Sequence, residues 1–302
     1  MQTEKVLLDT DIGGDIDDAV CLAYLLCEPR CALLGITTVC GDAHRRAAVA
    51  DAICRAAGKP VPVFAGHDRP LQPIDGYPLP EGAAALERWP HGDYTIQPAD
   101  AVEFLYRTIS EHPGEVTLIA IGNLTNVAAL FQKHPDSASL LKGLSLMNGY
   151  FGAAPLPELW YNWNAWADPL AAKIVYDTPV PCHRTLPLEI TEQLTIPAVE
   201  AEALLPADSD LMRAVYDFGS PWLQSAGVLT LHDPLAAVSV FHQDVCRFTR
   251  GRVTVETEDP ARMAATIFSP DDAAFAEVAA AVDRDRFYRI LADTLNGAVS
   301  FP

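Results

Sequence analysis

The sequence predicts a single α/β domain over residues 1–302, in which helices flank an open, mostly parallel sheet with a Rossmann-like core. Short apolar runs typical of buried strands, such as Val6–Leu8 and residues 115–121, alternate with longer apolar stretches that predict helices. Strand, helix and strand in this order form a parallel crossover unit. The chain is half apolar, which supports a large core, and it has no internal repeat or convincing linker.

The first half of the chain follows this alternation closely. After the strand at 6–8 we expect a helix at 19–26, a strand at 32–39, a helix at 45–57, a strand at 60–66, a helix at 100–110, a strand at 115–121, a helix at 127–132 and a strand at 144–150. The segment from His67 to Pro98 is rich in proline and glycine and has little periodicity. It therefore predicts a long surface loop of the kind that often covers a site.

The second half is expected to contain more helix. Helices are predicted at 169–176 and within 197–227, with a strand at 180–188 between them, and an apolar helix follows His232. The alternation from Arg252 onward predicts a β-hairpin. The amphipathic stretch Ala274–Leu295 predicts a closing helix.

The composition argues against several classes of partner. There are 40 acidic and 21 basic residues, and the formal charge of −19 argues against nucleic acid or an anionic membrane and favours a neutral or cationic small molecule. No signal-type region or membrane-spanning run is present, so we expect a cytoplasmic protein. The seven cysteines form no Cys-x-x-Cys pair, which favours reduced core thiols over disulfides or a zinc site.

An acidic loop follows the first strand. It holds five carboxylates within ten residues, namely Asp9, Asp11, Asp15, Asp17 and Asp18. In a parallel sheet this loop lies at the carboxyl end of the strand, where ligands bind. So many like charges are unfavourable without a positive group, and oxygen ligands suit calcium or magnesium. The alternative, in which these acids only cap the next helix, explains one or two of them but not five.

Two other motifs deserve comparison with this loop. An EF-hand starting at Asp9 needs a glutamate at its twelfth position, which is Val20, so that interpretation fails. A haloacid-dehalogenase-type phosphatase also begins with a strand that ends in Asp-x-Asp, and Asp9 and Asp11 match it. Gly13 stands where that class has Thr or Val, and its phosphate would need positive groups. This aspartate-nucleophile phosphatase is kept as the weaker alternative.

Polar residues follow several later strands. Asp42 comes after the strand at 32–39, either as a group that supports or contacts a sugar or as the N-cap of the next helix. Asn162, Trp163 and Asn164 belong to a segment with three tryptophans and two asparagines. Because buried amides demand partners, we favour a loop that hydrogen-bonds a sugar and stacks on a ring over an Asn-capped helix start.

A His-Asp pair opens a late apolar helix. A lone pair of this kind is usually an N-cap. Beside an acidic metal loop, however, Asp233 is a candidate for a remote metal ligand, and His232 is a candidate acid or base.

These segments occur together in a recognisable order. They read Asp9-Thr10-Asp11-Ile12-Gly13, Asp17-Asp18-Ala19, Gly35-Ile36-Thr37-Thr38-Val39, Gly122-x-Leu124-Thr125-Asn126, Asn164-x-x-x-Asp168-Pro169 and His232-Asp233-Pro234-Leu235-Ala236. Over nearly the whole chain they resemble the inosine/uridine-preferring nucleoside hydrolase family. The resemblance implies calcium-dependent hydrolysis of the N-glycosidic bond of a ribonucleoside or related N-riboside, by a water that the metal holds, to give free base and ribose. It also implies an assembly expected to be a homodimer or homotetramer.

The resemblance also implies roles by position. Calcium would be held by Asp11, Asp18, Asp233 and the backbone carbonyl of Ile121, with Asp15 as a further candidate ligand. Asp17 and Asn164 would bind the ribose hydroxyls. Asp11 would take the proton from the attacking water, and His232 would assist departure of the base. The full set of expected substrate contacts is Asp17, Asp42, Asn148, Asn162, Trp163, Asn164 and Asp233.

The chemistry agrees with these roles. Cleavage of an N-glycosidic bond builds positive charge on the sugar, which carboxylates stabilise. No Arg or Lys lies in the motifs, which favours hydrolysis over phosphorolysis.

Some positions depart from the family pattern. Asp15 comes from an acidic loop two residues longer than usual, and Asn162 stands where the family usually has a glutamate near the sugar 5′ end. Asp42 replaces a common asparagine and Asn148 a glycine. The base and 5′ ends are therefore expected to be altered, which leaves open an uncommon substrate. A binding relative that keeps the metal but not the turnover is the third hypothesis.

Overall fold

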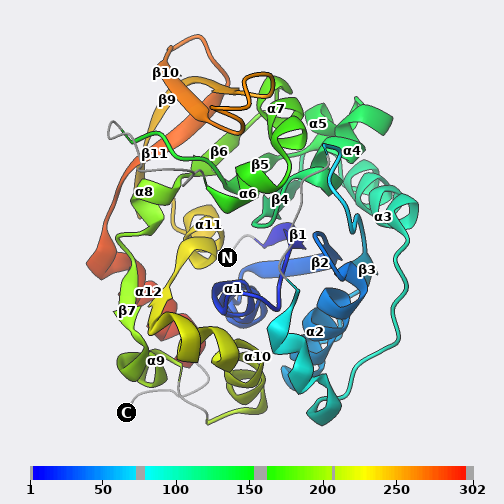
Figure 1. Cartoon of the computed structure of the whole chain (residues 1–302), viewed down its shortest axis with the longest axis vertical. Helices are drawn as coiled ribbons and strands as arrows, with labels where there is room; N and C mark the ends of the chain where they lie inside the picture. The colour runs from blue at the N-terminus through cyan, green and yellow to red at the C-terminus, as the bar shows by residue number, and fades with distance from the viewer. Residues whose placement is uncertain (1–2, 73–78, 153–161, 206–207, 297–302) are drawn as a thin grey trace.

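The fold is built on one nine-stranded sheet, seen in the computed structural model, which describes residues 3–72, 79–152, 162–205 and 208–296 (Figure 1). The strands are β1 (Glu4–Thr10), β2 (Cys31–Thr38), β3 (Val63–Ala65), β4 (Val116–Ala120), β5 (Gly143–Met147), β6 (His183–Leu186), β9 (Cys246–Val255), β10 (Thr266–Pro270) and β11 (Ala276–Val282), with β7 (Thr195–Pro197) and β8 (Val228–Thr230) forming a separate pair. Their order in the sheet is β10-β9-β11-β6-β5-β4-β1-β2-β3. All neighbouring pairs from β11 to β3 are parallel, and β9 is antiparallel to both of its neighbours. The predicted single α/β domain with an open, mostly parallel sheet is confirmed.

Helices cover both faces of this sheet. They are α1 (Asp17–Cys27), α2 (Ala43–Ala56), the 3-10 helix η1 (Glu81–Arg88), α3 (Pro98–Glu111), α4 (Thr125–Lys133), α5 (Ser137–Leu140), α6 (Trp163–Ala167), α7 (Pro169–Asp177), α8 (Leu188–Thr191), α9 (Ala198–Leu204), α10 (Asp210–Ala226), α11 (His232–Phe241) and α12 (Arg284–Asn296). None of the described helices is long and apolar enough to cross a membrane. All seven cysteines are free thiols, as expected.

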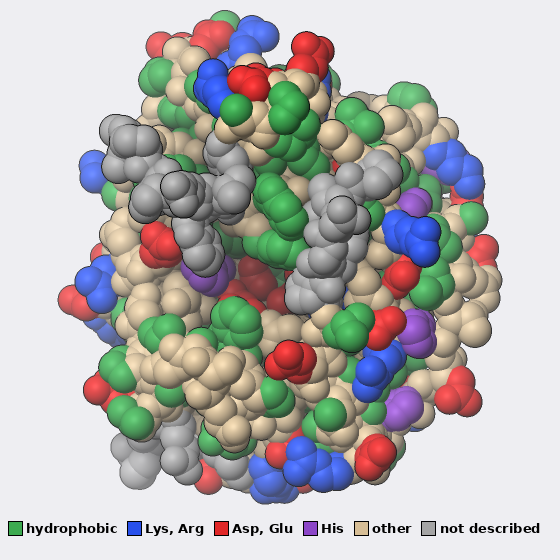
Figure 2. All heavy atoms as spheres, viewed as in Figure 1, with side chains coloured by type: hydrophobic (Ala, Val, Ile, Leu, Met, Phe, Trp, Pro, Cys, Tyr) green, Lys and Arg blue, Asp and Glu red, His purple; other side chains and the backbone are tan. Residues whose placement is uncertain are grey.

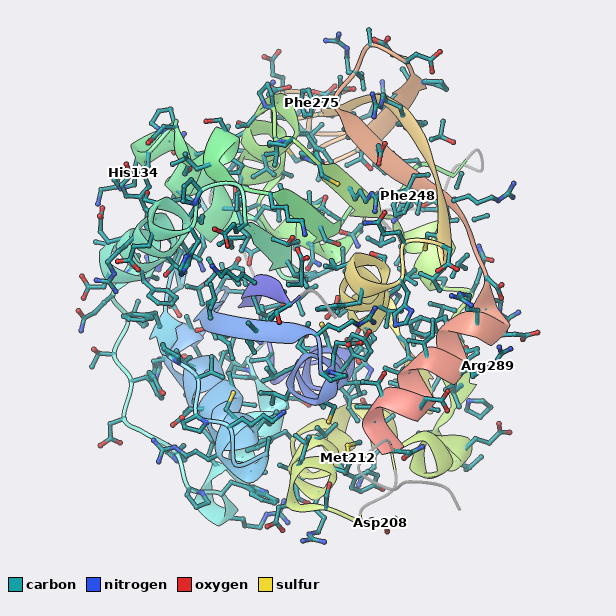
Figure 3. All side chains as sticks on the ribbon, turned by 180° about the vertical axis from the view of Figure 1, so that it is seen from behind. His134, Asp208, Met212, Phe248, Phe275 and Arg289 are labelled. Atoms are coloured by element: carbon teal, nitrogen blue, oxygen red, sulfur yellow. The ribbon has the colours of Figure 1, made fainter. Side chains whose placement is uncertain are left out.

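The alternation of β1 explains why there are two cores. Val6 and Leu8 face the core built with α1, α2, α10, α11 and α12, whereas Leu7 faces the core built with α3, α4 and α7. Residues on a strand alternate between faces, so a strand buried on both sides is apolar at every position. From behind, Met212 on α10 and Arg289 on α12 lie on one side of the sheet, and His134 at the end of α4 lies on the other (Figure 3).

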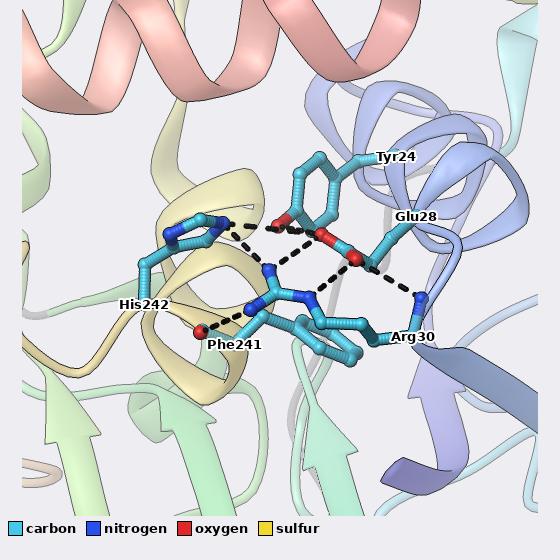
Figure 4. Close-up of polar contacts among 5 residues, drawn as sticks. All are labelled: Tyr24, Glu28, Arg30, Phe241 and His242. Carbon is cyan, nitrogen blue, oxygen red and sulfur yellow. Dashed lines mark hydrogen bonds and ion pairs between the residues drawn. The ribbon is translucent and has the colours of Figure 1, made fainter. Parts of the chain in front are cut away.

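Helices α1 and α11 pack side by side and are joined at their ends by a polar cluster (Figure 4). Arg30 donates to both carboxylate oxygens of Glu28, at 2.7 and 2.9 Å, and to the backbone carbonyl of Phe241 at 3.0 Å. One ring nitrogen of His242 lies 2.7 Å from the same guanidinium, and the Tyr24 hydroxyl donates to Glu28. The cluster therefore fixes how far one helix can slide along the other.

The expected closing helix is wrong in its first half. Residues 276–282 form β11, which pairs with β6 and β9, and only the part from Arg284 is helical. Alanine is a good helix former, but here Ala276 and Val278 are buried between two strands, so tertiary pairing overrides the local propensity. The expected hairpin is present as β9 and β10, although β9 begins earlier, at Cys246.

The long loop after β3 also contains more structure than expected. Helix η1 packs against α10, and the backbone N–H of Gly82 donates to the carbonyl of Gly13 at 3.0 Å. A Cβ atom at Gly82 would lie 2.0 Å from the carbonyl oxygen of Phe218, so only glycine fits here. This described part of the loop therefore lies directly on the acidic loop.

Candidate active site

Three buried carboxylates converge at the carboxyl edge of the sheet. Asp17 and Asp18 open α1, Asp233 opens α11, and one oxygen of each lies within 4.8 Å of the others. The backbone N–H of Asp233 donates to Asp17 Oδ2 at 3.0 Å, which joins the two helix starts. The face of the molecule is hollowed here, and acidic side chains line the bottom of the hollow (Figure 2).

Burial and mutual repulsion make this cluster costly by itself. Burial raises the pKa of Asp17, Asp18 and Asp233 well above its usual value, and neighbouring carboxylates raise it further. The pKa of Asp9 and that of Asp15 are raised to about 7, mainly by burial. A divalent cation at the cluster would remove the repulsion, and a donor set of carboxylate oxygens fits a hard cation. The residues present therefore fit a metal site.

Asp15 has a different environment from its neighbours. Its Oδ1 accepts the backbone N–H of Ile16 at 2.6 Å, so it shapes the turn at the start of α1. It does not cap the helix, because the N-cap residue of α1 is Ile16 and no side-chain cap hydrogen bond is formed there. Asp17 accepts its hydrogen bond from another helix, and Asp18 accepts one from the Thr10 hydroxyl.

Asp11 lies on the same loop, close to the cluster. Burial raises its pKa, whereas the charge of Arg46 and a hydrogen bond from the Trp163 side chain lower it. Its own charge raises the pKa of Asp18. Asp11 is not one of the three carboxylates that lie within 4.8 Å of one another, which are those of Asp17, Asp18 and Asp233. Gly122 allows Asp11 to lie close to the end of β4, because a Cβ atom there would lie 3.0 Å from Asp11 Oδ1 and 2.8 Å from Val39.

The asparagines lie where β4 and β5 end. Asn164 Nδ2 donates to the carbonyl of Ile121 at 2.6 Å and to that of Met147 at 2.9 Å. Asn148 is buried and accepts from the Tyr176 hydroxyl, while its Nδ2 has no hydrogen-bond partner within the described part of the chain. Two asparagines and the Ile121 carbonyl are thus brought to one edge.

Asn162 has the role that the alternative interpretation expected. It is the N-cap of α6, and its side chain accepts the backbone N–H of Ala165 at 3.2 Å. Its Nδ2 lies 3.4 Å from the Met147 sulfur. Trp163 and Trp166 pack on each other with ring centroids 5.3 Å apart, so each ring covers part of the other within α6.

Asp42 sits on a strained loop. It takes the N-cap position of α2 without forming a side-chain cap, and its φ of 61° is in the left-handed region. Cys40, two residues before it, has a φ of 71°. Non-glycine residues adopt this conformation rarely, and such strain concentrates at functional sites.

His232 is held next to the cluster by Thr191. The Thr191 hydroxyl lies 3.2 Å from the Leu188 carbonyl, to which it can donate, and 2.8 Å from His232 Nδ1. When the hydroxyl donates to Leu188 it accepts from Nδ1, and in that tautomer Nε2 is an acceptor. Burial lowers the pKa of His232 to about 4, which keeps the ring neutral at neutral pH.

Two positioning side chains are not evident from the motifs alone. Asp168 accepts the backbone N–H groups of Leu71 and Gln72 and the hydroxyl of Thr125, so it fastens the loop after β3 to the start of α4. Arg46 is 1% exposed and donates to the carbonyls of Asp11 and Ile12. A sequence signal did exist, because Arg46 falls on the apolar stripe of α2, three and four residues before Val49 and Ala50.

Comparison with known proteins decides the family. The family model described as inosine-uridine preferring nucleoside hydrolase matches residues 6–289. The chain belongs to this family. This nucleoside hydrolase is 31% identical to uridine nucleosidase 1 of Arabidopsis thaliana over 275 residues, covering 84% of this chain and 79% of the relative. It is 32% identical to probable uridine nucleosidase 2 of Oryza sativa subsp. japonica over 271 residues, with the same coverage.

Solved structures agree on the fold. The purine-preferring ribonucleoside hydrolase from Gardnerella vaginalis superposes with a TM-score of 0.82 at 23% identity, covering 97% of this nucleoside hydrolase and 98% of that chain. Family membership makes the chain a hydrolase of N-glycosyl compounds that cleaves the N-glycosidic bond of ribonucleosides. The alternative of an aspartate-nucleophile phosphatase is thereby set aside.

Proposed function

We propose that the ribonucleoside hydrolysis of this enzyme depends on calcium, held by Asp11, Asp18, Asp233 and the carbonyl of Ile121. The observation that carries the proposal is the convergence of buried carboxylates from α1 and α11. Six to eight oxygen ligands suit calcium, and the site offers carboxylate, carbonyl and amide oxygens. Asp15 is a further candidate ligand, although its hydrogen bond to Ile16 ties it to the turn.

Each neighbouring residue has a chemical task in this proposal. When bound, calcium orients the sugar hydroxyls and makes water easier to deprotonate. Asp17 and Asn164 hold the ribose hydroxyls, and Asp11 accepts a proton from the attacking water. The negative cluster stabilises the positive charge that develops on the sugar as the bond to the base breaks. These contacts are worth most where water is excluded, and the cluster is buried.

The role that we propose for His232 is narrower than that of a general acid. Burial keeps its ring neutral, and in the tautomer whose Nδ1 donates to Thr191 the other nitrogen, Nε2, is available as an acceptor. We assign it a role in orienting the leaving base, through a hydrogen bond from that base.

The residues expected to contact the 5′ end and the base of the substrate define the substrate preference. Asp42, Asn148, Asn162 and Trp163 stay predicted substrate contacts. Asn162 is engaged as a helix cap, whereas Asn148 keeps an amide N–H group for a ligand. Since the two relatives compared above are named uridine nucleosidase 1 and probable uridine nucleosidase 2, we propose uridine as the first substrate to test. The cytoplasmic location and the homodimer or homotetramer stay predictions from the sequence.

The test is release of reducing sugar from a panel of ribonucleosides. We expect activity that a chelator abolishes and that calcium restores. Asp11→Ala should lower the rate by several orders of magnitude, because it removes both a ligand and the proton acceptor. Activity that survives complete chelation would contradict the calcium proposal. A panel that stays inert while calcium binds would favour a specialist substrate or the binding relative.

A further inference from the structure

Arg46 joins two loops of the active site. Its Nε donates to the carbonyls of Cys40 and Gly41 at 3.1 and 2.9 Å, and both belong to the loop after β2. Its Nη1 donates to the carbonyls of Asp11 and Ile12 on the acidic loop, the latter at 3.1 Å. The side chain comes from α2 and is almost completely buried. One guanidinium therefore holds the backbone at both places.

The loop after β2 needs such a hold. Cys40 and Asp42 both have left-handed backbone conformations, with φ of 71° and 61°, which non-glycine residues adopt only at a cost in free energy. The hydrogen bonds from Arg46 fall on the carbonyls of Cys40 and of Gly41, which lies between the two strained residues. Strain of this kind persists only where the surroundings fix it.

We propose that Arg46 is a positioning residue that clamps these two loops together and so sets Asp11 relative to Asp42. The proposal rests on the calcium-dependent hydrolysis proposed above, in which Asp11 binds the metal and Asp42 contacts the sugar. The hydrogen bonds of Arg46 described above all end on backbone carbonyls of these two loops. In this proposal it acts mainly through the backbone that carries both carboxylates, and its charge also acts directly on Asp11.

The geometry requires arginine rather than a positive charge alone. A guanidinium is planar and presents donors in fixed directions, so Nε and Nη1 can serve two separate loops at once. A lysine ammonium is a compact point charge on a flexible stem and cannot reproduce this fork. The effect of the charge and the effect of the fork can therefore be separated by substitution.

The experiment compares Arg46→Lys and Arg46→Met with Arg45→Met, a matched control at the adjacent exposed arginine of α2. Calcium affinity is measured by calorimetry with the metal alone, and kcat and KM are measured with uridine. Hydrogen exchange is followed in residues 9–13 and 39–43. We expect both Arg46 variants to lose about 10- to 100-fold in calcium affinity or in kcat/KM, with faster exchange in both segments. Arg45→Met should behave like the wild type.

The outcomes separate the clamp from its alternatives. If Arg46→Lys has the calcium affinity, kinetics and hydrogen exchange of the wild type, only the positive charge matters and the proposal is overturned. Unchanged affinity, kinetics and exchange in Arg46→Met would also overturn it. If Arg46→Met does not fold, Arg46→Lys carries the test by itself. If the wild type neither binds calcium nor cleaves a nucleoside, the proposed function fails, while hydrogen exchange still tests the clamp.

A double substitution tests the route through Asp42. If Arg46 acts on the substrate through that residue, Arg46→Lys raises KM less in an Asp42→Ala background than in the wild type. Equal effects in both backgrounds would overturn this half of the proposal. The kcat effect, which runs through Asp11, should persist in both.

Discussion

The five acids of residues 9–18 are close in sequence but differ in their surroundings. Asp9 points back into the sheet, where Asn126 and Thr37 donate to its carboxylate. Asp15 shapes a turn, Asp17 accepts from α11, and Asp18 joins the buried cluster. A cluster of like residues in the sequence therefore contains several structural roles. Only the contacts made from other strands and helices distinguish them.

His183 illustrates a buried group that the reaction does not use. It lies at the start of β6 between the rings of Tyr176 and Phe275, and Figure 3 marks Phe275 at this end of the sheet. Burial lowers its pKa to about 4 from the usual 6.5. The neutral ring is favoured in the folded protein, while the unfolded chain binds a proton below pH 6.5.

This shift predicts a loss of stability in mild acid. The contribution of His183 is fully present above pH 6.5 and is lost as the pH falls from 6.5 toward 4, by up to about 3 kcal/mol. His183→Leu should flatten this part of the profile. Unfolding by urea at several pH values between 4 and 8 measures it. Parallel profiles for the variant and the wild type would contradict the assignment.

At the scale of elements, the far ends of α1 and α11 help to keep the carboxylates of the buried cluster aligned. Both helices begin at the site and end at the cluster of Glu28, Arg30 and His242 (Figure 4). Burial acts to raise the pKa of Glu28, but the hydrogen bonds from Arg30 outweigh it and lower the pKa overall. Glu28 and Arg30 therefore form a charged pair in the folded protein.

Removal of one partner should be costly. Arg30→Met leaves the buried Glu28 carboxylate without its main donors, and we expect a loss of about 1–3 kcal/mol in the free energy of unfolding. Lys173→Met is the matched control, because its pair with Asp177 is exposed on both sides. A second variant, Glu28→Gln with Arg30→Met, should recover part of the loss. Equal destabilisation by Arg30→Met and Lys173→Met would argue against a stabilising role of the polar cluster between the two helices.

Most elements were predictable because their signals are local. The sequence predicts strand β1 and the glycine turn after it correctly, since a strand buried on both faces is a nearly continuous apolar run. Residues 276–282 were not, because their strand state depends on pairing with β6 and β9. Asn162 caps α6, and its contact with the sugar stays a prediction, because the sequence pattern does not distinguish an amide that caps a helix from one that binds a ligand. The acidic loop was found from charge density, whereas the clamp by Arg46 depends on folding.

At the scale of the whole molecule, the proposed metal links distant parts of the chain. Asp17 and Asp233 lie 216 positions apart and meet only in the folded protein. A cation that binds the folded state alone raises the free energy of unfolding by about 2.7 kcal/mol when present at 100 times its dissociation constant. We therefore expect calcium to raise the melting temperature by several degrees.

Thermal unfolding with chelator and with added calcium measures this effect. Asp18→Asn should lose most of the calcium-dependent rise. Asp208→Asn, an exposed position marked in Figure 3, should keep it. Identical melting temperatures with and without calcium would contradict a metal bridge at the cluster.

The pairing of Asp17 with Asp233 also has a consequence for synthesis of the protein. The carboxylates of the first loop leave the ribosome early, and their partner helix α11 follows more than two hundred residues later. Until then β1 and α1 lack one wall of their core, since α11 packs directly on α1. Nascent chains that stop before residue 233 therefore carry an unpaired acidic loop that cannot close around a metal. Maturation of the site is among the last events of translation, however early its residues are made.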